Sequence, residues 1–209
     1  MSESDERFVH RIEAFSDIVI GFTLAQLGAQ LVVTGHPGSL LTDPGWFFNF
    51  LWTFAVVCGM WWLHNRLFRT IFAPTAASVM ANFALLASIV ILVYFAEEMA
   101  HAASPGDFVV GQRLYDCALS ACSLFVALIT FLGMRERAAM LASDILTRSK
   151  AVSFVNVFAA LFLLLTVAVS FVPVLYAWSP PILGLGIPAA YYLGRTVGRT
   201  MLRSEFRSP

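Results

Sequence analysis

Long apolar segments constrain this chain more than any other feature. Six of them can be delimited, each close to the roughly 20 residues that a helix needs to cross the hydrocarbon core of a bilayer. They cover residues 13–33, 46–68, 78–100, 110–134, 151–175 and 181–201. Backbone N–H and C=O groups inside a bilayer have to be paired within the spanning element, so each segment is expected to be a helix. The sequence therefore predicts an all-α integral membrane protein, with residues 1–209 forming a single six-helix domain.

The composition agrees with this class and excludes others. Hydrophobic residues make up 59% of the chain and charged residues 12%, and the mean hydropathy of +0.78 is too high for a soluble core wrapped in a polar surface. The formal net charge is zero, so no nucleic-acid partner is implied. Cys58, Cys117 and Cys122 lie in apolar segments without metal-ligand spacing, so no metal site is expected.

Basic residues are distributed asymmetrically along the chain. They precede the first segment, end the second, fill the fourth connection and end the chain: Arg7, Arg11, Arg66, Arg69, Arg135, Arg137, Arg148, Lys150, Arg195, Arg199, Arg203 and Arg207. Arg113 falls on the other side, where an ion pair with Asp116, one helical turn away, is expected. Because basic connections stay on the cytoplasmic side, this pattern predicts six crossings with both termini in the cytoplasm.

The first segment combines small residues with amides. Gly21, Ala25 and Gly28 form a small-residue stripe that would allow another helix to approach closely. Gln26 and Gln30, four residues apart, point the same way from within the membrane. An amide facing lipid would be unsatisfied, so this segment is expected inside an assembly. Its glutamines then either cross-link helices or line a wet path, and the sequence favours neither.

Charged residues lie at the mouth of the same segment. Arg11 and Asp17 are six residues apart and therefore on different helix faces, so each needs a partner from another helix. Candidates lie at the same depth at the end of the second segment. His64 and Asn65 can donate to Asp17, and the indole N–H of Trp61 also needs an acceptor. We expect a network between the first two helices.

The residues at these positions carry a family resemblance. They are Arg11, Phe15, Ser16 and Asp17 at the head of the first segment, Trp61, His64 and Asn65 at the end of the second, and Asn82 in the third. The chain resembles the transmembrane protein 175 family of lysosomal and bacterial potassium channels, whose defining motif is Arg-x-x-x-Phe-Ser-Asp. The resemblance covers the first three segments and is closest to the bacterial six-span members.

The resemblance implies a homotetramer in the plasma membrane of a bacterium, with the first helix lining a central pore for a potassium leak. The permeant potassium ion is implied, and no other cofactor. In the family a large aliphatic residue five positions after the motif aspartate forms the constriction, and a threonine often follows three positions later. The matching residues here are Phe22 and Ala25, with Ala29 one turn deeper and Gln26 beside them. A ring of Phe22 is expected to form a hydrophobic gate.

Two alternatives stay open beside the channel. Asp17 and His64 could relay protons in a proton-coupled or substrate-coupled carrier, or the chain could be a non-conducting relative that keeps the scaffold. An enzyme ranks last, because the sequence lacks His-Glu-x-x-His, Gly-x-Ser-x-Gly and a glycine-rich phosphate loop.

Overall fold

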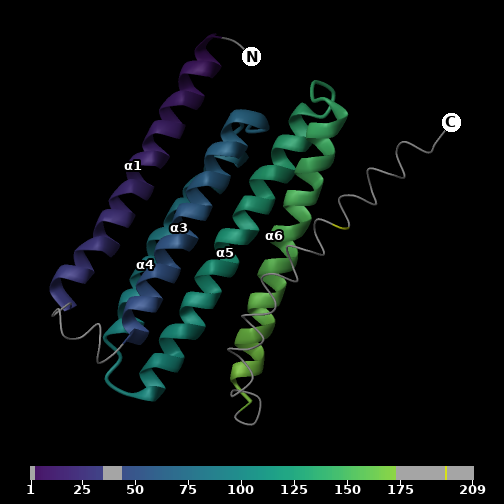
Figure 1. Cartoon of the computed structure of the whole chain (residues 1–209). Coiled ribbons are helices and arrows are strands. Elements are labelled where there is room, and N and C mark those ends of the chain that lie inside the picture. Colours follow the sequence, from purple (N-terminus) through teal and green to yellow (C-terminus); the bar gives the residue numbers. More distant parts are fainter. Residues whose placement is uncertain (1–2, 35–43, 173–195, 197–209) are drawn as a thin grey trace.

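The computed structural model describes residues 3–34, 44–172 and 196, and its regular secondary structure is helical (Figure 1). The helices are α1 (Glu3–Thr34), α3 (Pro44–Thr70), α4 (Ala76–Ala100), α5 (Pro105–Arg137) and α6 (Ser143–Ser170). No strand occurs among the described residues, and five helices are long and apolar enough to cross a membrane. The all-α prediction is confirmed for this part of the chain.

The last predicted segment falls on residues that the structure does not describe. Of residues 181–201 only residue 196 is described, and residues 173–175 at the end of the fifth segment also lie outside the described part. The six-span count and the cytoplasmic position of both termini therefore stay predictions.

Local sequence signals explain where the helices begin. The Thr75 hydroxyl accepts a hydrogen bond from the N–H of Ser78 at 3.3 Å, which caps α4. The Ser104 hydroxyl accepts from the N–H of Asp107 at 3.2 Å and caps α5, where Pro105 occupies the first turn. Helices α1, α5 and α6 begin several residues before the predicted segments, because polar turns can continue a helix beyond the hydrocarbon core, where water pairs their free backbone groups.

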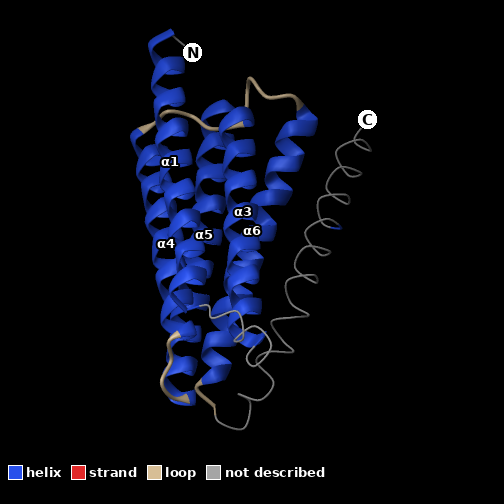
Figure 2. Ribbon diagram, turned by 60° about the vertical axis from the view of Figure 1, so that its left-hand side comes forward, coloured by secondary structure: helices blue, strands red, loops and turns tan. Residues whose placement is uncertain are grey.

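Helix α4 contacts α1, α3 and α5, while α6 packs on α5 (Figures 1 and 2). Leu85, Ile89 and Leu92 of α4 are fully buried, as are Cys122 and Val126 of α5. Such buried side chains contribute many small dispersion contacts that together stabilise the helix packing. Helices α1 and α6 therefore lie at opposite edges of a core built on α4 and α5 (Figure 1).

One glycine allows α5 to approach the turn that follows α3. A Cβ atom added to Gly133 would overlap the backbone carbonyl oxygen of Ile71 and lie 3.0 Å from its Cγ1. Arg137, one turn further along α5, donates from Nη1 to the carbonyl of Phe72 at 3.1 Å. Because a backbone carbonyl cannot swing aside as a flexible side chain would, the end of α5 is held closely against this turn.

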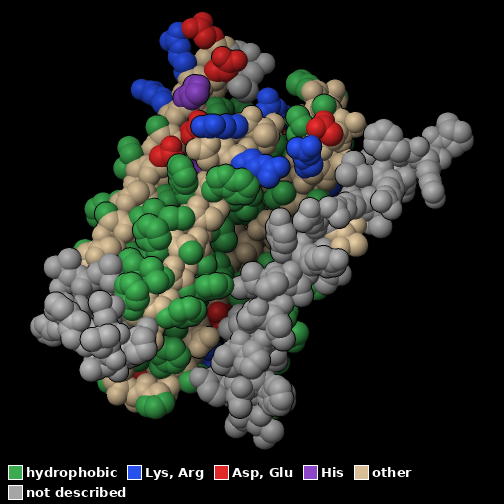
Figure 3. All heavy atoms as spheres, in the orientation of Figure 1, with side chains coloured by type: hydrophobic (Ala, Val, Ile, Leu, Met, Phe, Trp, Pro, Cys, Tyr) green, Lys and Arg blue, Asp and Glu red, His purple; other side chains and the backbone are tan. Residues whose placement is uncertain are grey.

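Charged side chains gather at one end of the bundle, and apolar side chains predominate on the part of the side that Figure 3 shows. This end holds the start of α1, the ends of α3 and α5 and the start of α6, which carry the basic residues used for the topology prediction. We call it the basic end. The arrangement suits helices that lie in lipid, with their charged termini in the polar regions.

The expected ion pair between Arg113 and Asp116 is wrong. Arg113 instead donates from Nε to the Ser170 hydroxyl at 2.8 Å and from Nη2 to the Ser170 carbonyl at 2.6 Å. Its guanidinium also lies over the Phe171 ring, 3.9 Å from the centroid. The last turn of α6 leaves carbonyl groups without intrahelical partners, so it offers Arg113 acceptors that the sequence spacing did not indicate.

Candidate functional site

Helix α1 has one face buried against α3 and α4. This face carries Ile12, Ser16, Ile20, Thr23 and Leu27, each at most 6% exposed. Their spacing of three and four residues is that of one side of a helix. Two of the five are polar, and both hydroxyls bond within the helix: Ser16 donates to the carbonyl of Ile12 and Thr23 to that of Val19, each at 2.8 Å.

The opposite face of α1 is exposed along its described length. We call this surface the open stripe, and its residues follow each other at alternating intervals of four and three: Arg11, Phe15, Ile18, Phe22, Ala25 and Ala29. Phe22 is 72% exposed and Ile18 is 69% exposed. The predicted pore residues Phe22, Ala25 and Ala29 thus lie in one row, and Gln26 lies exposed beside it. The side chain of Gln30 lies outside the described residues.

The small residues of α1 have no close neighbour within the described part of the chain. Gly21 and Gly28 meet no heavy atom of it within 4 Å of an added Cβ. Both were expected to allow another helix to approach closely. In the single subunit that approach is not used, so the predicted stripe stays free for contact with another chain or with lipid.

A buried polar chain joins three helices at the level of Ser16. Asn82 of α4 donates from Nδ2 to the Ser16 hydroxyl at 3.0 Å, and Nε2 of His64 in α3 lies 2.9 Å from Oδ1 of Asn82. All three side chains are at most 1% exposed. Since the Asn82 oxygen can only accept, Nε2 of His64 carries the hydrogen, and Nδ1 is a buried acceptor without a partner in the described residues.

A second contact between α1 and α3 lies beside this chain. The indole Nε1 of Trp61 donates to Oδ1 of Asp17 at 2.9 Å. The expected donors to Asp17 were His64 and Asn65, but His64 turns to Asn82, and no hydrogen bond joins Asn65 to Asp17 in the described structure. Trp61 precedes His64 by about one helical turn, so the two side chains reach neighbouring positions on α1. Trp61, His64 and Asn65 were all expected at the depth of Asp17, but the bond to Asp17 comes from Trp61 and not from His64 or Asn65.

Aromatic contacts frame these two hydrogen-bonded groups. Phe15 meets Phe83 of α4 edge to face, with ring centroids 5.9 Å apart. His64 stacks on Phe68 within α3 at 4.4 Å, and Phe68 stacks on Phe72, in the turn after α3, at 4.0 Å. Offset and edge-to-face geometries are the favourable ones for aromatic pairs. Phe15 packs against α4 with one edge although it is half exposed on the open stripe.

Arg11 differs from the other motif residues. Its side chain is exposed at the basic end, and it forms no ion pair with a carboxylate of the described residues. The structure thus brings Phe15, Ser16 and Asp17 to partners on α3 and α4, and it leaves Arg11 on the open stripe. Asn82, which bridges His64 and Ser16, was identified only as part of the family pattern, and its polarity inside an apolar segment was the available signal.

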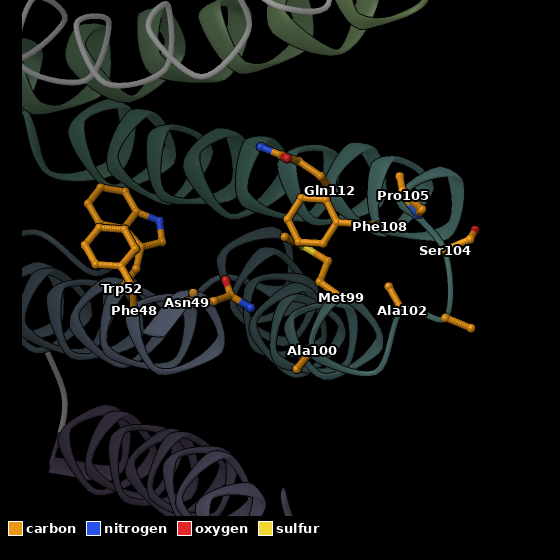
Figure 4. A pocket seen from close by; sticks show the side chains of 12 residues that line it. Phe48, Asn49, Trp52, Met99, Ala100, Ala102, Ser104, Pro105, Phe108 and Gln112 are labelled. Atoms are coloured by element: carbon orange, nitrogen blue, oxygen red, sulfur yellow. The ribbon is translucent and has the colours of Figure 1, made fainter. Parts of the chain in front are cut away.

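A separate cavity of about 540 Å³ lies far from these contacts, where the start of α3 meets the turn between α4 and α5 (Figure 4). Phe48, Trp52, Met99, Phe108 and Gln112 line it. No sequence pattern indicated this cavity. Among the described residues, no group of three His, Cys, Asp or Glu side chains is placed to hold a metal ion.

These features define a polytopic helical membrane protein in which the first helix docks through polar contacts and keeps a long apolar face open. Residues 11–92 match the model of the family described as endosomal/lysosomal potassium channel TMEM175. The resemblance carried by the motif is thereby confirmed for α1 from Arg11 onward, α3 and most of α4. A search of curated proteins finds no match. The family is one of ion channels, so the match supports a membrane channel rather than an enzyme.

Proposed function

We propose that the protein is a potassium-permeable leak channel formed by four copies of the chain around a pore lined by α1. The observation that carries this proposal is the open stripe, an exposed row of mainly apolar side chains on a helix whose opposite face is docked by polar contacts. These contacts fix the rotation of α1 and thereby decide which of its faces stays open. The family match over the same helix supports the assignment.

Phe22 forms the constriction in this proposal. Its side chain is 72% exposed and points away from α3 and α4, so symmetry around α1 would bring copies of its ring together. Apolar constrictions gate channels by expelling water rather than by blocking the path with charge. Ala25 and Ala29 continue the same row with small side chains and would leave a wider passage, with the Gln26 amide at its edge.

The buried polar chain sets which face of α1 meets the pore. Ser16 bonds to Asn82, and Asp17 bonds to Trp61, so two consecutive residues of α1 are held by two different helices. Consecutive residues differ by about 100° around a helix, so two such contacts fix its rotation. Arg11 lies at the basic end of the stripe, which we place at the cytoplasmic side in a bacterial plasma membrane, with residues 1–209 forming one six-span subunit.

The carrier alternative receives less support from the geometry. A proton relay between Asp17 and His64 needs the two groups within reach of each other or of a shared partner. Asp17 instead bonds to Trp61 and His64 to Asn82. Neither Trp61 nor Asn82 has an ionisable side chain that could pass a proton between them.

Cation flux in liposomes tests the channel. Purified wild type and Phe22→Ala are compared in potassium and sodium gradients, with Phe131→Ala as the matched control, because Phe131 is an exposed phenylalanine on α5. We expect flux that prefers potassium and grows in Phe22→Ala, since removal of the apolar ring favours water, while Phe131→Ala matches wild type. Equal flux in wild type and Phe22→Ala would place Phe22 outside the pore, and a stable oligomer without flux in any variant would favour the non-conducting relative.

A further inference from the structure

A small crevice at the basic end lies between the last turns of α3 and the first turns of α6. Its cavity measures about 80 Å³. Arg66 and Thr70 line it from α3, and Arg148 and Ser149 line it from α6, with Leu67 and Ile145 among its apolar walls. These residues are about 80 positions apart in the sequence and take no part in the α1 contacts. The crevice therefore calls for its own explanation.

The positive charge in this crevice has no counter-charge among the described residues. Two arginines line it, and none of its described lining residues is Asp or Glu. Neither Arg66 nor Arg148 forms an ion pair with a carboxylate of the described residues, and Glu136, at the same end, lies beside Arg135 at 4.0 Å. Two like charges that line one cavity repel each other, and an anion bound between them would be attracted to both and offset that repulsion. Guanidinium groups match phosphate oxygens with paired donors.

A serine hydroxyl adds a third donor to this crevice. Ser149 is 8% exposed and lines the crevice, and its hydroxyl makes no hydrogen bond to another described residue. It is therefore available to a ligand that enters the crevice. The Thr70 hydroxyl already donates to the Arg66 carbonyl at 2.8 Å. The Arg66 guanidinium lies over the Trp62 ring, 5.8 Å from its centroid, a contact that leaves its N–H groups available. The donors of the crevice are thus the two arginines and Ser149, a set that fits an acceptor-only group such as phosphate.

From these observations we propose that the crevice binds the phosphate of an anionic phospholipid headgroup. A cavity of this size accommodates a phosphate group rather than a whole lipid. The apolar walls of Leu67 and Ile145 continue along helices that are long enough to cross the bilayer, so an acyl chain can follow them from the same site. Basic pockets between helices on the cytoplasmic side suit such headgroups. This site does not depend on the proposed channel activity.

Native mass spectrometry of the full chain tests the proposal. The wild type in nanodiscs that mix dioleoyl-phosphatidylglycerol with dioleoyl-phosphatidylcholine is compared with Arg66→Gln/Arg148→Gln and with Ser149→Ala. The control is Arg69→Gln/Arg135→Gln, which removes two exposed arginines of the same end that do not line the crevice. We expect phosphatidylglycerol to stay bound to the wild type and the control, and to bind about tenfold more weakly to the crevice double variant, because charge-assisted bonds are the strong ones.

Several outcomes would overturn this proposal. A wild type that retains phosphatidylcholine as well as phosphatidylglycerol shows no headgroup site, whatever the variants do. An equal loss in the crevice and control variants indicates attraction to the basic end as a whole. Displacement of the lipid by millimolar inorganic phosphate would make the crevice a site for a soluble anion instead. Should the double variant not fold, judged by its elution profile, Ser149→Ala and Arg148→Lys decide, with weaker retention expected for both.

Discussion

The two faces of helix α1 differ in the polarity of their side chains and in what they contact. Its buried face includes the hydroxyls of Ser16 and Thr23, and Ser16 bonds to Asn82 of α4, whereas its exposed face is mainly apolar and includes Phe22. A soluble protein shows the reverse arrangement. In a bilayer the lipid is as apolar as a leucine side chain, so apolar burial gives little preference for one helix orientation, and hydrogen bonds and close packing have to supply it. The contrast indicates that specific contacts, rather than hydrophobicity, orient this helix.

The largest expected effect is a loss of stability when a side chain of the buried face is truncated, compared with truncation of a larger side chain on the exposed face. Ile20→Ala removes a side chain that is 1% exposed, and core truncations of this kind cost about 2–5 kcal/mol. Phe22→Ala removes a larger side chain that has few neighbours in the subunit, so it should change stability much less. Thermal unfolding in detergent measures both variants. An equal loss for Phe22→Ala would show that Phe22 packs in a contact between subunits and does not face an open pore.

A second prediction concerns the polar part of the buried face. Asn82→Leu keeps the number and branching of the side-chain heavy atoms but leaves His64 Nε2 without its acceptor and Ser16 without its donor, and an unsatisfied buried group costs about 1–3 kcal/mol. We expect a lower unfolding temperature and less tetramer on size-exclusion chromatography. Asn156→Leu is the control, because Asn156 bonds only to the carbonyl of Val152 in its own helix. Comparable losses in both variants would contradict a special role for Asn82.

The smallest expected effect is that of the exposed bond between Trp61 and Asp17. Hydrogen bonds to a charged group contribute about 1.5–3 kcal/mol, and exposure to water reduces this value. We expect Asp17→Asn and Trp61→Phe to lower tetramer yield modestly while the permeability ratio of potassium to sodium stays unchanged.

The double variant sharpens this test. If the two side chains act through one bond, Asp17→Asn/Trp61→Phe should lose little more than either single variant. Additive losses would indicate that Asp17 and Trp61 act through different partners. A changed permeability ratio in Asp17→Asn alone would assign the carboxylate to the ion path and not to helix packing.

The sequence was sufficient for the number and type of the described helices, because bilayer thickness fixes the length of an apolar span. The sequence was less informative about helix ends, since α6 begins at Ser143 in a polar stretch that carries no continuous hydrophobic signal. It placed Asp17 at the depth of Trp61 and His64, yet depth along a helix does not specify rotation. Successive residues are rotated by about 100° around a helix axis, so the donor that reaches Asp17 depends on the rotation of α3 and α1. Only the packed structure specifies that rotation.

The crevice of Arg66 and Arg148 shows a different limit of sequence reasoning. Both residues were read as topology signals, because each belongs to a basic connection. Their convergence on one cavity depends on how α3 and α6 are placed by the α4 and α5 core, and no short-range pattern reports that placement. Arg113 gives the same lesson, since its acceptors on Ser170 are 57 residues away in the chain.

The polar chain that begins at His64 ends on a backbone atom. His64 donates to Asn82, Asn82 to Ser16, and Ser16 to the carbonyl of Ile12, which as a helical carbonyl also accepts the N–H of Ser16. Helices α3 and α4 thus hold α1 through the short Ser16 side chain, which is itself bonded to the backbone of α1, and not through a long and flexible side chain. These hydrogen bonds therefore fix the rotation of α1 relative to α3 and α4. A rotation of α1 by one residue would break these hydrogen bonds and replace Phe22 on the open stripe by Gly21 or Thr23. The bonds that hold the helix therefore also determine which side chain the open stripe presents.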